Sequence, residues 1–172
     1  MRQFLADHKQ WVSFLKVSIV IFLIIRLATS LVLLIGIIRP PMVMPFETYA
    51  NSTIQELEQN GDFFSKYFLS PWYRWDTVHY LGISENGYDS QPLYTVWPPF
   101  YPILIKIFSF ILKPSLLAAI VVSNLFLIIS ITVFLKLITD LFNETIAKES
   151  LFFLLLFPTS LYLIAPYTGS IF

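Results

Sequence analysis

A continuous apolar segment near the N-terminus, Phe14–Ile38, most constrains what this chain can fold into. It exceeds the roughly 20 apolar residues that a helix needs to cross the hydrocarbon core of a bilayer. Lys16 and Arg26 are the only charged residues within it. Over the whole chain, 56% of residues are hydrophobic and 13% are charged, against about 45–50% and about 25% in soluble domains. The sequence therefore predicts an integral membrane protein.

Further apolar segments predict an all-α, multi-pass architecture with about four transmembrane helices. The expected spans are 14–38, 98–112, 115–138 and 151–172, and residues 39–97 form a long loop between the first two. Pro158 and Pro166 are expected to kink or break the fourth span, because proline cannot continue the hydrogen bonding of a helix. Residues 1–172 are thus expected to be the N-terminal part of a single transmembrane domain in a longer, truncated chain.

The basic residues predict how the chain is oriented. The N-terminal tail carries Arg2, Lys9 and Lys16, whereas the 39–97 loop is mainly acidic. By the positive-inside rule the N-terminus is cytoplasmic and this loop lies outside. With four spans, the 139–150 loop would lie outside as well. A bacterial plasma membrane is the favoured location, and the ER membrane is the alternative for a eukaryotic host.

Helical spacing recurs inside the long loop. The segment Ser52–Phe68 has few breakers apart from Gly61, and Trp72–Asn86 continues the same kind of pattern. Both are expected to form short helices at the membrane surface. Gly87 suits the end of the second, because glycine readily takes the left-handed conformation that closes a helix.

Asp76 is the strongest candidate for chemistry, because it is a carboxylate among aromatic side chains. On a period of 3.6 residues, Asp76, His79 and Tyr80 fall on one face of the expected helix. Trp and Tyr favour the boundary between membrane and water. A carboxylate in that setting is partly removed from bulk water and can be a stronger base. The plainer interpretation is a structural ion pair with Arg74 or His79.

Several motifs along the chain carry a resemblance in combination. They are Arg74-Trp75-Asp76, Glu85-Asn86-Gly87-Tyr88, Ser123-Asn124-Leu125, Phe157-Pro158-Thr159-Ser160 and Ala165-Pro166-Tyr167-Thr168-Gly169-Ser170-Ile171-Phe172. Together they resemble GPI mannosyltransferase II and its prokaryotic relatives. That family belongs to the GT-C class of multispanning glycosyltransferases, which use a polyprenyl-phosphate sugar on the non-cytoplasmic side. One position departs from the pattern, since family members typically carry a Glu where Gly169 stands.

The resemblance implies a hexosyltransferase, similar to a mannosyltransferase, that moves a sugar from a polyprenyl or dolichyl phosphate to a glycan or glycolipid. It implies that Asp76 is the general base for an inverting displacement. The candidate substrate-binding residues are Arg74, Trp75, His79, Tyr80, Tyr88 and Tyr167. For Arg74 the alternative role is a lipid headgroup anchor, and for His79 it is structural.

No metal ion and no cofactor is expected. The chain has no Cys, and it lacks Asp-x-Asp, His-x-x-x-His and a glycine-rich phosphate loop. Its 11 basic and 11 acidic residues give no positive excess that would attract nucleic acid. The expected partners are therefore the lipid-linked sugar donor, the glycan or glycolipid acceptor, and membrane lipid.

Two other functions fit parts of the sequence. In a fragment of a secondary transporter, Arg26, Asp76 and the broken fourth span would line a pathway. In a non-catalytic membrane protein that binds a lipid-linked sugar, the Gly at position 169 would reflect a lost activity. The concentration of acidic residues in the outer loop favours the transferase over the transporter.

Overall fold

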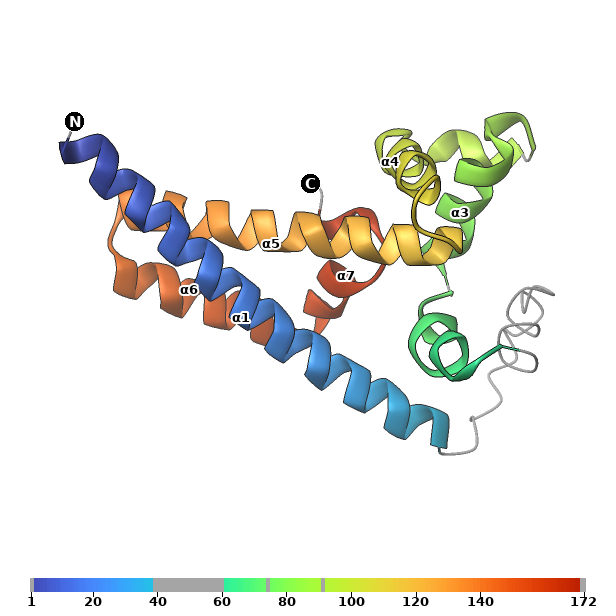
Figure 1. The fold of residues 1–172 in the computed structure, drawn as a ribbon, viewed down its shortest axis with the longest axis horizontal. Coiled ribbons are helices and arrows are strands. Elements are labelled where there is room, and N and C mark those ends of the chain that lie inside the picture. The colour runs from blue at the N-terminus through green and yellow to red at the C-terminus, as the bar shows by residue number, and fades with distance from the viewer. Residues whose placement is uncertain (1, 39–60, 74, 91, 171–172) are drawn as a thin grey trace. The chain divides into compact units, whose positions relative to one another are not determined.

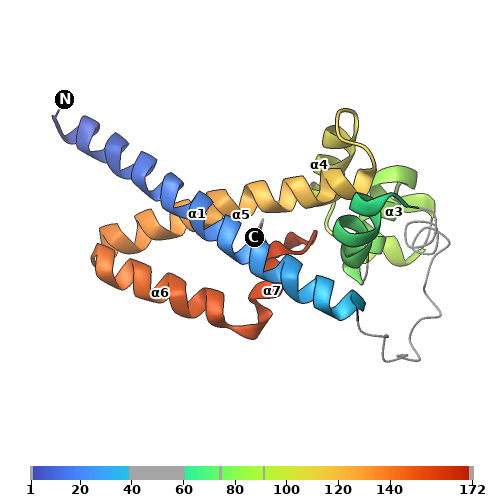
Figure 2. The ribbon, with the colours of Figure 1, turned by 60° about the horizontal axis from the view of Figure 1, so that its bottom comes forward.

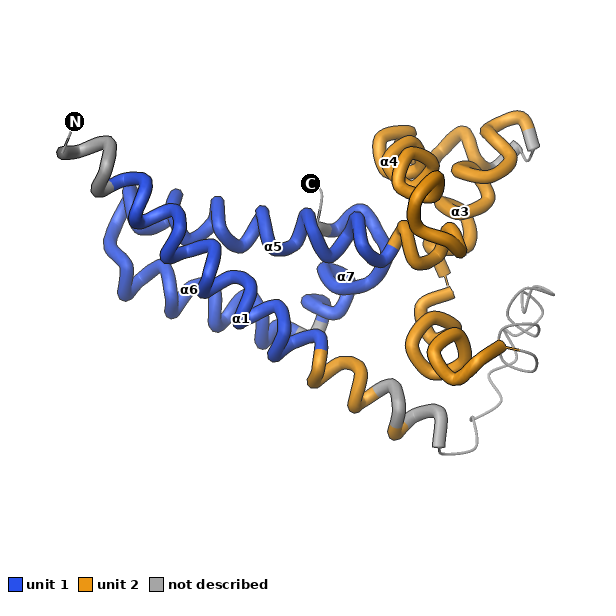
Figure 3. The backbone as a smooth tube through the Cα atoms, viewed as in Figure 1, with its two compact units in different colours: residues 1–26, 120–172 blue, residues 27–119 orange. Residues whose placement is uncertain are grey.

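The computed structural model describes residues 2–38, 61–73, 75–90 and 92–170, and over these residues it contains helices and turns but no strand. The elements in chain order are α1 (Arg2–Ile38), η2 (Ser65–Leu69), η3 (Ser70–Trp72), α3 (Asp76–Asn86), η4 (Tyr88–Ser90), η5 (Pro92–Val96), α4 (Phe100–Ser109), α5 (Ser115–Leu141), α6 (Glu144–Leu156), η6 (Pro158–Ser160), α7 (Leu161–Ile164) and η7 (Thr168–Ser170) (Figure 1). The chain divides into two compact units (Figure 3). Unit 1 comprises Met1–Arg26 and Ile120–Phe172, and unit 2 comprises Leu27–Ala119.

Among the described residues, two helical stretches are long and apolar enough to cross a membrane, namely Asp7–Val32 of α1 and the whole of α5. They overlap the expected spans 14–38 and 115–138. In the expected span 98–112 the helix α4 has only ten residues. Ten residues of helix measure about 15 Å, roughly half of the hydrocarbon core. The structure therefore does not confirm a span at 98–112.

The segment 151–172 is likewise not one helix. It begins inside α6, which starts earlier than expected because the Asn143 side chain caps it, accepting a hydrogen bond from the Ile146 backbone N–H at 2.9 Å. The helix stops before Phe157, which takes the extended conformation that a following proline favours. The break expected at Pro158 is confirmed. A continuous fourth span is not, since only the four-residue helix α7 and single turns follow.

The two long helices run antiparallel within unit 1 (Figure 2). The Nζ atom of Lys136 lies 3.0 Å from Oδ1 of Asp7 and 2.6 Å from Oδ1 of Asp140. Further along, the Thr132 hydroxyl donates to the Ser18 hydroxyl at 2.9 Å. The N-terminal end of α1 and the C-terminal end of α5 therefore meet at the same end of the unit.

This ion pair bears on the expected topology. Four spans would place the 139–150 loop on the side of the membrane opposite to the N-terminus. The contact of Lys136 with Asp7, close to the start of α1, favours the same side for both. The chain would take that course if α4, a helix of about 15 Å, does not cross the bilayer.

Unit 1 buries polar as well as apolar side chains, and it also exposes many large apolar ones. Ser18 is fully buried and donates to the Phe14 carbonyl at 2.8 Å, while its oxygen accepts from buried Thr132. Ser123, also fully buried, donates to the Tyr167 carbonyl at 3.2 Å. Large apolar side chains are exposed along α5 at every fourth residue, and we call them the α5 stripe: Leu125, Ile129, Val133, Leu137 and Leu141. Ser130 and Asp140 are exposed on the same helix. A helix on the surface of a soluble protein instead exposes a mainly polar face.

Candidate active site

The helix that carries Asp76 starts at that residue. The sequence predicted a start at Trp72, but Trp72 belongs to the preceding turn η3, and Trp75 has a φ of 48°. A positive φ is rare for a side chain as large as Trp, and it breaks a right-handed helix. The predicted end is confirmed, since Gly87 has a φ of 79° and its N–H donates to the Ile83 carbonyl at 2.9 Å.

Backbone strain therefore lies directly before the candidate carboxylate. A residue held in a sparsely populated region of φ and ψ costs about 1–3 kcal/mol, and such residues gather at functional sites. The Trp75 carbonyl accepts a hydrogen bond from the Val78 N–H at 3.1 Å, which fixes the first turn of α3. With its ring 69% exposed, Trp75 projects its indole from the same turn that presents the partly exposed Asp76.

One turn after Asp76, α3 carries His79 and Tyr80, which belong to a group of rings that we call the aromatic cluster: His79, Tyr80, Tyr94, Trp97 and Tyr101. The His79 ring stacks on Trp97, with 4.9 Å between ring centroids and 18° between planes. Tyr80 meets Trp97 edge to face at 5.1 Å and Tyr101 edge to face at 5.0 Å. Tyr94 meets the edge of His79 at 6.1 Å. Such geometries add about 0.5–1.5 kcal/mol per pair beyond burial, so the cluster anchors the turn of α3 that follows Asp76.

Tyrosine hydroxyls fasten this cluster to the backbone. Tyr88 donates to the Trp97 carbonyl at 2.8 Å, and the fully buried Tyr101 donates to the Ala119 carbonyl at 2.9 Å. Burial raises the pKa of the Tyr88 hydroxyl. Because an ordinary tyrosine pKa is already near 10, Tyr88 keeps the proton that this hydrogen bond requires at neutral pH.

The Tyr94 side chain packs closely against Gly82 of α3. Its ring is only 6% exposed and lies across α3 at Gly82. Burial first, and then the nearby Tyr73 and Glu85, raise the pKa of Tyr94, so its phenol also stays neutral. A Cβ atom at position 82 would lie 2.8 Å from Cζ of Tyr94 and nearer still to its hydroxyl oxygen. Gly82 is thus required by close packing and not by backbone conformation.

We expect Gly82→Ala to lower the free energy of unfolding by about 1–3 kcal/mol, the usual range for overpacking a core. Alanine favours a helix over glycine by about 1 kcal/mol, but its Cβ would displace the Tyr94 ring, which is buried and packs against His79. Thermal unfolding in detergent measures the change. The control is Tyr94→Phe, in which the closest atom is gone, so that the same Gly82→Ala change should cost less. An increase in stability in both backgrounds would contradict this packing.

Two predicted site residues do not belong to the described part of unit 2. Arg74 falls outside the described residues. Tyr167 belongs to unit 1, where it is buried, stacks on Tyr162 at 5.8 Å with 29° between planes, and is held by Ser123 through its carbonyl. The structure therefore brings Asp76, Trp75, His79, Tyr80 and Tyr88 together within unit 2 alone.

Gly169 packs closely against the backbone. A Cβ atom at this position would lie 3.0 Å from the carbonyl oxygen of Tyr162. A glutamate there, as in the family that the sequence resembles, would require the turn after α7 to shift by a few tenths of an ångström. The tight turn after α7 therefore favours glycine at position 169.

Sequence reasoning missed part of the cluster. Tyr94, Trp97 and Tyr101 were not among the predicted site residues, although Trp97 contacts both His79 and Tyr80. The available signal was Gly82, because an isolated glycine within a helical pattern often marks a close approach by another group. Within the described part of the chain, no three His, Cys, Asp or Glu side chains are grouped as they would be to hold a metal ion.

Comparisons with protein-family models, with curated proteins and with solved structures found no match to this chain.

Proposed function

We propose that this chain carries the catalytic base of a multi-pass membrane hexosyltransferase, of the GT-C type and similar to a mannosyltransferase. It would transfer a hexose from a polyprenyl- or dolichyl-phosphate sugar to a glycan or glycolipid acceptor on the non-cytoplasmic face. The observation that carries the proposal is the position of Asp76, which follows a strained Trp75 and begins the helix whose next turn packs on the aromatic cluster.

The distribution of apolar side chains supports insertion in a membrane. Along the described part of α1, large apolar side chains are exposed on several sides of the helix: Val12, Leu15, Ile19, Val20, Leu23, Ile24, Leu27, Leu31, Val32 and Ile35. Exposed apolar patches on soluble monomers rarely exceed a few hundred Å². Buried hydrogen bonds link Ser18 to Thr132 and Ser123 to Tyr167. Hydrogen bonds from small polar side chains hold helices together in lipid.

Asp76 would act as the general base. Its carboxylate takes the proton from an acceptor hydroxyl while that oxygen forms a bond to the anomeric carbon. The bond between the anomeric carbon and the phosphate oxygen breaks on the opposite face, and the lipid phosphate leaves with the electron pair. One displacement inverts the configuration, so a β-linked mannosyl phosphate gives an α-mannoside, and a second carboxylate nucleophile is not needed.

The aromatic side chains would bind the sugar. Trp75 offers an exposed indole face next to Asp76, whereas Tyr80 is buried and supports the ring of Trp97. Sites for small molecules combine such apolar faces with a few polar groups that fix orientation. His79 is partly exposed and sits one helical turn after Asp76, within reach of a substrate on the same face. Arg74 is a candidate for the phosphate, because guanidinium groups bind it in bidentate fashion.

A transfer assay on the purified protein in proteoliposomes tests this function directly. The donors are polyprenyl phosphate mannose and polyprenyl phosphate glucose, and the product is identified as a glycoside with its anomeric configuration. Transfer with inversion supports the proposal. Sugar or ion flux in the same proteoliposomes, without glycoside formation, would support a transporter, and donor binding without turnover would support a non-catalytic protein.

We expect transfer to be independent of divalent cations. Mg²⁺ and Mn²⁺ favour about six oxygen ligands, and the neighbours of Asp76 in the sequence that carry donor groups are Arg74, Thr77 and His79. The activity should therefore survive treatment of the purified protein with EDTA. Strong inhibition that is reversed by added Mn²⁺, but not by the same concentration of Ca²⁺, would indicate a metal ligand set that includes Asp76.

A further inference from the structure

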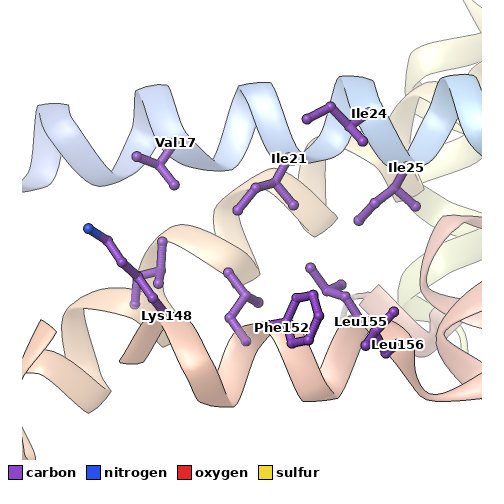
Figure 4. Close-up of a pocket in the computed structure, with 10 residues that line it drawn as sticks. Val17, Ile21, Ile24, Ile25, Lys148, Phe152, Leu155 and Leu156 are labelled. Carbon is purple, nitrogen blue, oxygen red and sulfur yellow. The ribbon is translucent and has the colours of Figure 1, made fainter. Parts of the chain in front are cut away.

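An apolar groove with one cationic end lies within unit 1. It encloses about 410 Å³ between α1 and α6, with α5 at its base. Figure 4 shows Ile21 and Ile25 of α1 facing Phe152 and Leu155 of α6 across it. Leu135 of α5 is buried and lines the same space. The volume falls within the roughly 300–1,000 Å³ of sites that enclose small molecules.

Among the described residues that line the groove, Lys148 alone is charged. It lies near Val17, towards the end of unit 1 where Asp7 meets Lys136 (Figure 4). The opposite end is lined by Ile24, Ile25, Leu155 and Leu156 and is purely apolar. The groove is therefore cationic at the end near Lys148 and apolar at the end near Ile25.

Lys148 forms only a weak, exposed ion pair with Glu144. Its ammonium group lies 2.7 Å from Glu144 one turn earlier in α6, and both side chains are more than half exposed. Exposed pairs at this spacing contribute only about 0.3–0.5 kcal/mol. An anionic group that entered the groove could therefore recruit Lys148 at little cost.

We propose that the groove binds one anionic phospholipid of the leaflet on the N-terminal side, with an acyl chain between α1 and α6 and the phosphate at Lys148. This inference rests on the insertion of the chain in a membrane, which is part of the proposed function, but not on catalysis. A phospholipid has its anionic phosphate at the membrane surface and its apolar tail towards the bilayer centre. The groove matches this arrangement, because Lys148 lies at one end and apolar side chains line the other. A packed helix, about 10 Å wide, is too thick to enter a space of this volume.

The test uses the protein in nanodiscs that contain phosphatidylglycerol with a photoactivatable group in its acyl chain. Cross-linked peptides should come from the α1 segment 17–25 and the α6 segment 148–156, at a higher density than from the exposed stripe of α5. Ile21→Trp fills the groove and should reduce this labelling to the level of the α5 stripe. The matched control is Val133→Trp, which adds the same bulk on that stripe and should leave groove labelling unchanged.

Headgroup recognition is tested with phosphatidylcholine that carries the same tail. One lysine near a membrane surface favours an anionic lipid by roughly fivefold, and this preference should disappear in Lys148→Gln. Lys9→Gln, which removes an exposed cation from the N-terminal end of α1 outside the groove, should retain it. Polyprenyl phosphate is the third probe, and displacement of phosphatidylglycerol by an equal amount of it would overturn the assignment in favour of the sugar carrier.

Several outcomes would reject the lipid site. Equal labelling of the groove and the α5 stripe would mean that only bulk lipid is present, and labelling of the stripe without labelling of the groove would mean that lipid does not enter the groove. Carbonate extraction separates these outcomes from a failure of the proposed function. A protein that carbonate removes from the membrane contradicts both proposals, whereas an inserted and active protein with an unlabelled groove contradicts this inference alone.

Discussion

Replacing Asp76 by Asn should reduce sugar transfer by roughly 10²–10⁴-fold, the usual contribution of a general base. Asparagine keeps the size of the side chain and most of its hydrogen bonds, but it cannot accept the acceptor proton. The measurement is initial-rate transfer by purified protein at saturating donor, with protein abundance and thermal stability recorded in parallel. Expression should be unchanged, because the Asp76 side chain is only partly buried.

If Asp76 has only a structural role, Asp76→Asn should affect stability and not turnover. A carboxylate in the first turn of a helix interacts favourably with the helix dipole, by about 0.3–1 kcal/mol. Loss of that interaction would lower the melting temperature by a few degrees and leave turnover nearly normal. Asp89→Asn is the control, since Asp89 is an exposed carboxylate in the same loop region and should change neither property. Near-normal turnover in Asp76→Asn would remove Asp76 as the base.

The sequence predicted those parts of the fold that depend on local chemistry. The helices α1 and α5 follow from uninterrupted apolar runs, the end of α3 follows from Gly87, and the break after α6 follows from Pro158. Each is a property of a few neighbouring residues. Hydrophobic spacing alone, however, does not distinguish a short apolar helix from a span, which is why α4 was expected to be longer than it is.

Features that depend on contacts distant in sequence were not predictable. The positive φ of Trp75 leaves no trace in the sequence, because nothing in a Trp side chain favours that conformation. The packing of Tyr94 over Gly82 joins two segments through space, and only the glycine hinted at it. The pairing of Asp7 with Lys136 joins helices from the two ends of the chain. Within the candidate site, the identity of Asp76 came from its neighbours in sequence, while its aromatic support came from the fold.

The pairing of Asp7 with Lys136 leads to a prediction with an all-or-none result. Cysteines introduced singly at His8 and Thr145 should lie on the same side of the membrane, and one at Asp89 on the other side. All three positions are exposed, and the native chain has no cysteine that would interfere. Since the N-terminal tail carries Arg2, Lys9 and Lys16, that shared side should be the cytoplasm. A membrane-impermeant maleimide on intact cells should label only the cysteine at position 89, and lysis should expose the other two.

The cysteine at position 145 decides between the two topologies, because four spans would make it react together with the one at position 89. Such a result would mean that α4 crosses the membrane and that Lys136 cannot meet Asp7. The glycosylation triplet Asn143-Glu144-Thr145 gives an independent measurement in a eukaryotic host. On the cytoplasmic side it should remain unmodified, and Asn143 is already engaged as the cap of α6 through its hydrogen bond from Ile146. A glycan at Asn143 would place the turn between α5 and α6 in the lumen. If Asn143 carries no glycan and the cysteine at position 145 is protected, α1 and α5 form an antiparallel pair, and the helix ends that carry Asp7 and Lys136 lie in the cytoplasm.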